Sequence, residues 1–207
     1  MMSCLQFVRS SLRQGMVCGV SLLLGTLLAV GQETILPVQD RTLSRSGDTV
    51  QLFSANDARL FAGAGSAEVG ELRALFNFKL DKSSAQITRA TTVLLKITRQ
   101  SQTGKIGTYR LIHVTDAPGA VVIDKSAFDA TGELVKRFDG SALRDNETLA
   151  INVTACVKKD IEDGRSFALF RIEAESPGGV SDNIRLYPGQ GGGIPSDASY
   201  RAQLQIQ

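Results

Sequence analysis

The stretch RALFNFKL, residues 73–80, has the alternation of a β-strand and decides the fold prediction for the whole chain. Its polar side presents Arg73, Asn77 and Lys79. Its apolar side presents Ala74, Phe76, Phe78 and Leu80. This two-residue periodicity predicts that one face packs on a core, while the other meets solvent or a ligand.

The same periodicity recurs in short segments separated by turn residues. The segments are 48–53, 58–63, 90–100, 107–116, 120–124, 147–154, 165–175 and 200–207. About eight to ten short strands with few helices favour an all-β fold. We therefore predict a two-sheet antiparallel β-sandwich of the jelly-roll type.

One segment, TACVKKDIEDG at 154–164, breaks the strand pattern. Its apolar residues have helical spacing, with charged residues between them. Thr154 is a suitable N-cap and Gly164 a suitable C-terminal stop. The segment therefore predicts one short helix near residues 154–163.

The first 31 residues predict a secretory signal peptide. Arg9 and Arg13 precede an apolar run, 16–30, and polar residues follow at once. A membrane anchor is the alternative, but the run is short against the roughly 20 apolar residues of a spanning helix. We therefore expect a secreted protein, extracellular or at the cell surface, with no stable membrane span after the signal is removed.

The rest of the chain is expected to form one domain. Residues 32–47 are polar and aperiodic, which predicts a flexible lead-in. Residues 48–207 then form a single β-sandwich domain of ordinary size.

Removal of the signal leaves no net charge. The chain has 23 Lys and Arg against 21 Asp and Glu, and Arg9 and Arg13 are the only charged residues among the first 31. A formally neutral chain gives no indication of a nucleic-acid partner. Cys156 is then the only cysteine, which excludes an internal disulfide, and its apolar surroundings predict a small buried residue rather than a nucleophile.

No catalytic constellation is recognisable in the sequence. His113 is the only histidine and has no nucleophile motif beside it, so we predict a strand histidine with a local hydrogen bond. One histidine and one mature cysteine do not supply an ordinary zinc site. We therefore expect no enzyme, no cofactor and no metal. Two alternatives stay open: a polysaccharide lyase using Tyr, Arg and Lys chemistry, and a structural calcium held by oxygen ligands. The candidate calcium ligands are Asp124, Asp129, Asp139, Asp145 and Asp182.

The order of the segments is itself informative. In sequence they read Asp48-Thr49-Val50, LFAG (60–63), RALFNFKL, ITRATTVLLKI (87–97), TYRLIHVTD (108–116), INVTACV (151–157), SFALFRI (166–172) and RAQLQIQ (201–207). This series resembles the DNRLRE-type domains, secreted jelly-roll modules that are also classed among carbohydrate-binding modules. The resemblance covers about residues 48–207. Lys79 and Asn152 stand where the family favours Asp, and Tyr and Trp are scarce. The resemblance implies a jelly-roll fold and carbohydrate binding.

Five residues are the candidate ligand contacts. Arg73, Asn77 and Lys79 project from one side of a strand, and Arg185 and Tyr187 form a second pair in DNIRLY. Because Arg and Lys clamp carboxylates, acidic polysaccharides suit these side chains better than neutral ones. The alternative is that all five are ordinary solvent-facing strand residues.

These observations predict a secreted, non-catalytic polysaccharide-binding module. Its partner would be a polysaccharide or a component of the cell surface or matrix. The alternative is a structural or adhesive module of the same surfaces that has no glycan ligand.

Overall fold

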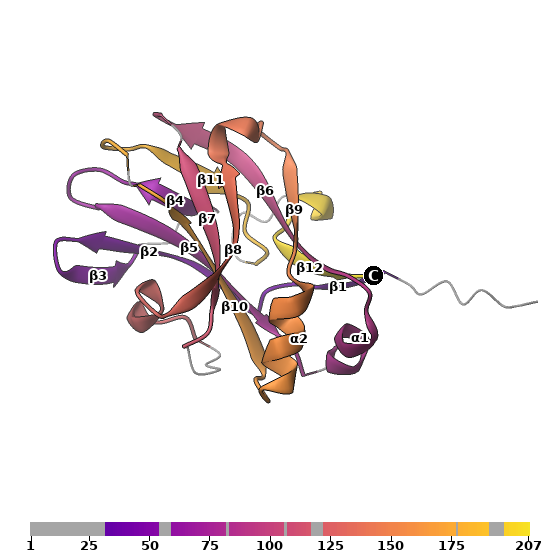
Figure 1. The fold of residues 1–207 in the computed structure, drawn as a ribbon. Coiled ribbons are helices and arrows are strands. Elements are labelled where there is room, and N and C mark those ends of the chain that lie inside the picture. The colour runs from indigo at the N-terminus through magenta and orange to yellow at the C-terminus, as the bar shows by residue number, and fades with distance from the viewer. Residues whose placement is uncertain are drawn as a thin grey trace, which may run out of the picture. The chain divides into compact units, whose positions relative to one another are not determined.

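Short antiparallel strands fill the described part of the chain (Figure 1). The computed structural model describes residues 32–53, 59–81, 83–105, 107–116, 122–176, 178–190 and 197–207. The predicted signal peptide, 1–31, lies outside these residues. The strands are β1 (Glu33–Ile35), β2 (Gln39–Ser46), β3 (Thr49–Leu52), β4 (Leu60–Ala64), β5 (Glu71–Lys79), β6 (Val93–Thr103), β7 (Thr108–Val114), β8 (Gly132–Asp139), β9 (Thr148–Asn152), β10 (Phe167–Ala174), β11 (Asn183–Leu186) and β12 (Gln203–Ile206). The helices are α1 (Ser84–Arg89) and α2 (Thr154–Glu162), with 3₁₀ turns η1 (Lys125–Phe128), η2 (Gly140–Ala142) and η3 (Ala198–Tyr200).

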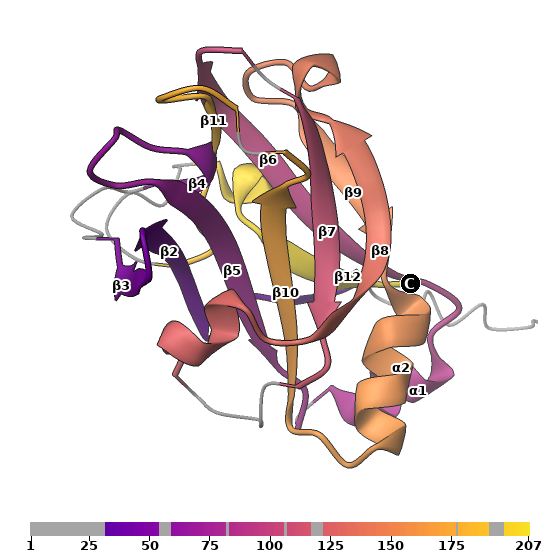
Figure 2. The ribbon, with the colours of Figure 1, turned by 60° about the vertical axis from the view of Figure 1, so that its left-hand side comes forward.

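The strands form one curled sheet. In the described residues it has 12 strands, ordered β1-β12-β6-β11-β4-β5-β10-β7-β8, with β2 on β5, β3 on β2 and β9 on β6. The long strand β6 belongs to both layers, because its first half pairs with β12 and β9 and its second half with β11. Figure 2 shows β5, β10, β7 and β8 running side by side in one layer, with β6 and β12 behind them. The predicted all-β antiparallel sandwich is confirmed, and its two layers are continuous through β6.

The core lies between the two layers. The apolar side of RALFNFKL points into it, and each of its four side chains is at most 1% exposed. Strand β10 adds Ala168, Phe170 and Ile172, and the opposite layer adds Leu95 and Leu204. The predicted inward faces of 90–100, 147–154, 165–175 and 200–207 are therefore confirmed.

A second, smaller apolar cluster lies on the outer face of β5 and β10. Leu75 and Leu169 pack there beneath Phe128, which is fully buried. Phe128 comes from the segment 122–130, which contains η1 and lies across these strands (Figure 2). The central strands are therefore covered on both faces.

The predicted flexible lead-in, 32–47, is wrong, because β1 and β2 occupy it. Strand β2 pairs with β5 over seven residues of register, from Gln39 opposite Asn77 to Arg45 opposite Glu71. Its buried positions include Asp40, Thr42 and Ser44, which are polar. The domain therefore begins before residue 48.

Other segment predictions had mixed outcomes. Helix α2 is confirmed, and Gly164, with φ of 72°, follows its end. Thr154 is the first helical residue rather than the cap, and its N–H donates to Asn152 Oδ1 at 3.0 Å. Residues 122–124 form no strand, whereas α1 and β8 were not predicted. None of the helices in the described ranges is both long and apolar enough to cross a bilayer.

The cover over β5 and β10 can be tested at Phe128. Phe128→Ala should lower the free energy of unfolding by about 3–5 kcal/mol, because it empties a buried aromatic site. Val122→Ala is the matched control from the same segment, since Val122 is 60% exposed and should change stability by about 0.5 kcal/mol or less. Urea unfolding measures both. Equal losses in the two variants would show that the segment does not cover the sheet.

Candidate functional site

Arg73, the first residue of the opening stretch, is a structural link. Its side chain is 13% exposed, and its Nε donates to Glu71 Oε1 at 2.7 Å. Its guanidinium lies 4.1 Å from the ring centroid of Phe128 and also donates to the Phe128 carbonyl oxygen. Arg73 therefore holds the segment 122–130 on β5 through a hydrogen bond to the Phe128 backbone and a cation–π contact with the Phe128 ring.

Glu173 on β10 forms ion pairs with the neighbouring arginines. Its side chain is 5% exposed, and it accepts from Arg110 at 2.7 Å and from Arg171 at 2.8 Å. Arg171 also donates to the carbonyl oxygens of Ala127 and Ala130. The cations on this face are thus paired with carboxylates or with backbone of the covering segment, which leaves them little charge to offer a ligand.

The other two candidates on β5 differ from one another. Asn77 is 3% exposed and lies between β2 and β10, so it is not accessible to a polysaccharide. Lys79 is 45% exposed, and its Nζ lies 2.8 Å from Asp81 Oδ2. The polar side of RALFNFKL therefore presents one accessible cation, which has a carboxylate beside it.

Arg185 lies on β11, in different surroundings. Its guanidinium is 5.7 Å from the ring centroid of Phe61, and its Nη2 donates to Thr103 Oγ1 at 3.1 Å. None of these contacts is shared with Arg73 or Lys79. The structure therefore does not gather the predicted cations into one group.

Tyr187 follows β11 and pairs with a second tyrosine. Its ring stacks on Tyr200, with centroids 5.6 Å apart and an interplanar angle of 12°. Its hydroxyl donates to Asn146 Oδ1 at 2.9 Å. Both rings are half-buried, so part of this aromatic surface is open to solvent.

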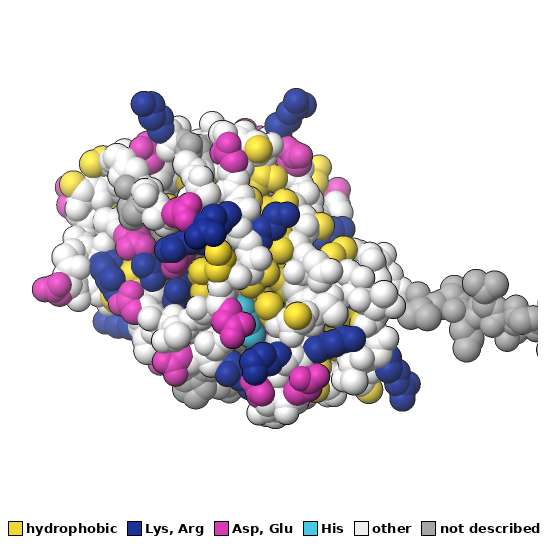
Figure 3. Space-filling model, in the orientation of Figure 1, with side chains coloured by type: hydrophobic (Ala, Val, Ile, Leu, Met, Phe, Trp, Pro, Cys, Tyr) yellow, Lys and Arg dark blue, Asp and Glu magenta, His cyan; other side chains and the backbone are white. Residues whose placement is uncertain are grey.

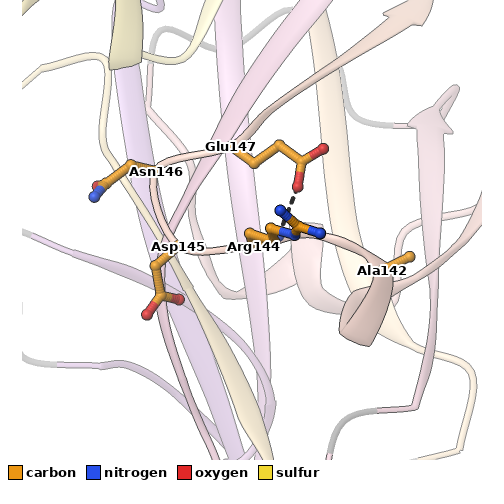
Figure 4. Close-up of a pocket in the computed structure, with 5 residues that line it drawn as sticks. All are labelled: Ala142, Arg144, Asp145, Asn146 and Glu147. Atoms are coloured by element: carbon orange, nitrogen blue, oxygen red, sulfur yellow. Dashed lines mark hydrogen bonds between the residues drawn. The ribbon is translucent and has the colours of Figure 1, made fainter.

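Asn146 belongs to a loop that borders a hollow of about 490 Å³. The lining residues are Ala142, Arg144, Asp145, Asn146 and Glu147. Figure 4 shows the side chains of Asp145 and Asn146 on one side of the loop and those of Arg144 and Glu147 on the other. The hollow thus offers carboxylate, amide and guanidinium groups next to the tyrosine pair.

The loop is firmly held. The Asn146 N–H donates to the Arg99 carbonyl oxygen at 2.7 Å, and the Arg144 N–H donates to Glu147 Oε2 at 2.7 Å. The buried guanidinium of Arg99 lies 3.3 Å from Asp145 and donates to the Gly140 carbonyl oxygen at 3.1 Å. Asn146 takes a left-handed conformation, φ 64°, which asparagine tolerates well. A ligand would therefore meet these groups already in place.

The aspartates considered for calcium have protein partners. The Ser126 hydroxyl and N–H bond to Asp124 and hold its pKa below the ordinary value, and Ser141 does the same for Asp139. Asp182 accepts backbone N–H groups from Lys105 and Gly179, both at 2.8 Å. Asp129 and Asp145 form ion pairs with Arg45 and Arg99. A structural calcium stays a prediction that the geometry does not test.

The single histidine, His113, is buried near the C-terminal end of β7. His113 Nε2 lies 2.7 Å from Asp160 Oδ2, and Asp160 Oδ1 lies 3.4 Å from Arg165. Figure 3 shows the histidine, in cyan, only as a small patch between acidic and basic side chains. Burial lowers the pKa of His113, but the hydrogen bond that its Nε2–H donates to Asp160 and the interaction with Cys156 outweigh burial and raise the pKa to about 9. The carboxylate of Asp160 therefore favours the protonated form of His113.

Comparison with protein-family models finds no match, and comparison with curated proteins finds no similar sequence. The resemblance to DNRLRE-type domains therefore stays a prediction.

Sequence reasoning found Tyr187 but missed its partners. Tyr200 ends the 3₁₀ turn η3, and Asn146 lies in the loop before β9, 41 residues from Tyr187, so no pattern in the sequence shows that the three residues meet. The Tyr content was a usable signal, since the chain has only three Tyr and no Trp. Two of those three meet in the stack.

The buried ion pair predicts a pH-dependent stability. The pKa of His113 is about 9 in the folded chain, against 6.5 for an ordinary histidine side chain. Because the folded pKa is raised, the stabilisation is complete below about pH 6.5 and is lost as the pH rises through about 9. The unfolding free energy of the wild type should exceed that of His113→Gln by on the order of a few kcal/mol at pH 6. That difference should shrink by pH 9.5.

Urea unfolding at several pH values measures this difference. Asp160→Asn should remove most of the pH dependence in the same window, because it removes the partner that raises the pKa. A wild-type advantage that is constant from pH 6 to pH 9.5 would contradict the assignment of an imidazolium to His113.

Proposed function

We propose that the chain is a secreted, non-catalytic polysaccharide-binding module that holds its ligand at the Tyr187–Tyr200 stack and the loop 143–147. The observation that carries the proposal is this half-exposed tyrosine pair, joined by a hydrogen bond to the border of the hollow. An aromatic face, with its partial negative charge, suits the C–H groups of a sugar ring. Nearby carboxylate and amide groups suit its hydroxyls.

The charges at this site favour a neutral glycan over an acidic one. The loop carries two carboxylates, Asp145 and Glu147, against the guanidinium of Arg144, and Asp145 also pairs with the buried Arg99. These charges balance, so the site offers no net positive charge to a polysaccharide with carboxylate or sulfate groups. The expected preference for acidic glycans depended on Arg73, Lys79 and Arg185. Arg73 and Lys79 have carboxylates beside them.

The shape of the site supports binding rather than catalysis. The hollow is open to solvent, and its groups belong to a loop that is already fixed by Arg99. Rigid polar groups beside an aromatic surface reduce the entropy lost on binding but supply no reactive centre. We expect each single site to bind weakly. A polysaccharide made of repeated sugar units compensates for the weak affinity of one site by making several contacts at once.

Affinity electrophoresis in gels that contain a neutral or an acidic polysaccharide tests the proposal. The wild type should be retarded in neutral gels, and Tyr187→Ala should weaken the retardation at least about 5-fold, since each stacking contact contributes on the order of 1 kcal/mol. Tyr187→Phe keeps the ring and should retain most of the retardation. Lys79→Ala is the control, because Lys79 is exposed but lies on β5.

Three results would count against this site. Retardation only in acidic gels, lost in Lys79→Ala, would place the site on β5. Equal retardation of the wild type and Tyr187→Ala would remove the tyrosine pair from the site. Absence of retardation in every gel, with the melting temperature unchanged, would favour the structural or adhesive module.

A further inference from the structure

A second hollow, of about 350 Å³, lies between the turn that joins β6 to β7 and the loop that joins β10 to β11. Tyr109 and Ala174, which are opposite one another in the register of β7 and β10, are buried and form its base. Its walls include Gly107, Gly178 and Gly179, so much of the wall surface is backbone. A volume of this size is within the range of sites that bind small molecules.

The polar groups of this second hollow are held in place and carry no net charge. Asp182 Oδ1 accepts the Lys105 N–H and Asp182 Oδ2 accepts the Gly179 N–H, both at 2.8 Å. Each carboxylate oxygen keeps a lone pair that can accept a hydrogen bond from a hydroxyl group. Lys105 also lines the hollow, and its ammonium charge balances that of Asp182. The second hollow therefore suits sugar hydroxyls without favouring an ion of either sign.

A chain of contacts joins the second hollow to the one beside the tyrosine pair. Gly107, in the wall of the second hollow, accepts the Gly140 N–H at 3.1 Å. The Gly140 carbonyl oxygen accepts from Arg99, whose guanidinium also pairs with Asp145 in the lining of the first hollow. The 3₁₀ turn η2 begins at Gly140 and ends at Ala142, which lines the first hollow as well. The two hollows therefore lie on either side of η2.

The arrangement of the strands places these segments at one end of the sheet. In both Figure 1 and Figure 2 the turn between β6 and β7, the loop between β10 and β11, and η2 lie at the upper end, whereas α2 lies at the lower end. All three segments are attached to hydrogen-bonded strands, so the separation of the two hollows is fixed by strand register. A long ligand meets both hollows already in place, which reduces the entropy lost on binding.

We propose that the second hollow is a further subsite for the same neutral polysaccharide, so that one chain of sugar units runs from the tyrosine pair over η2 to Gly107. This inference rests on the proposed function and extends its site from one contact region to two. Two subsites that bind one chain raise the apparent affinity, because the second contact forms within the same complex. The module therefore prefers long chains to short ones.

Competition by free sugars measures this preference. The full chain is run in gels that each contain one neutral polysaccharide: hydroxyethylcellulose, arabinoxylan or galactomannan. The competitors are the disaccharide and the hexasaccharide with the backbone linkage of the polysaccharide that retards the chain. The hexasaccharide should release the wild type at a concentration at least about 10-fold lower than the disaccharide, because only the longer sugar reaches both subsites.

Gly107→Leu fills the second hollow. A Cβ at Gly107 meets no atom within 4 Å, so the side chain can be added without a clash. The variant should lose most of the preference for the hexasaccharide, to about 2-fold or less, and should keep the wild-type response to the disaccharide, which needs only the tyrosine pair. Ala155→Leu is the control, because it adds the same side chain at an exposed position of α2, and it should behave as the wild type does.

Three results would overturn the second subsite, and they separate it from the proposed function. If Gly107→Leu keeps the full preference for the hexasaccharide at the wild-type melting temperature, the second hollow is not a subsite, while the tyrosine pair remains the binding site. Equal release of the wild type by both sugars has the same meaning and needs no variant that might misfold. If none of the gels retards the wild type, the proposed function fails and the subsite fails with it.

Discussion

The structure depends on the coverage of β5 and β10 on both faces. Their inner faces form the sandwich core, and Leu75 and Leu169 face the covering segment 122–130 on the outside. A charged side chain on a doubly covered strand loses its water and must find a partner. Arg73 and Arg171 do so at Glu173. On the polar side of RALFNFKL, Arg73 therefore attaches the segment 122–130 to the sheet.

The same constraint explains the polar strand β2. At the end of the sandwich, Asp40 accepts the N–H groups of Gly189 and Gln190 at 2.6 and 2.9 Å. Burial raises the pKa of Asp40, and those two hydrogen bonds oppose the rise. Thr42 accepts the Phe61 N–H at 2.9 Å. Asp40 and Thr42 are tolerated here because each accepts from backbone donors, and Asp40 joins the start of the domain to the segment after β11.

Alternation predicted the strands whose buried positions are apolar, and it failed where burial is polar. The inner face of β5 was readable because a hydrophobic face repeats every second residue. Strand β2 was not, because the partners of Asp40 and Thr42 are distant in sequence. For the same reason no pattern in the sequence showed that Arg73 has a partner, because that partner, Phe128, lies 55 residues away. The candidate site was partly predictable: Tyr187 was named, but Tyr200 and Asn146 become its neighbours only in the folded chain.

Both faces of the central strands are occupied, and the proposed binding site lies at an end of the sheet. Strand β9 connects this site to α2. The loop 143–147 enters it, beside the tyrosine pair, and α2 leaves it, carrying Cys156 and Asp160 (Figure 1). Its pairing with β6 over five residues fixes both ends in register with the core. A change in the packing of β9, whose Ile151 is 2% exposed, would therefore disturb the two places together, whereas a change in either loop or helix alone would not.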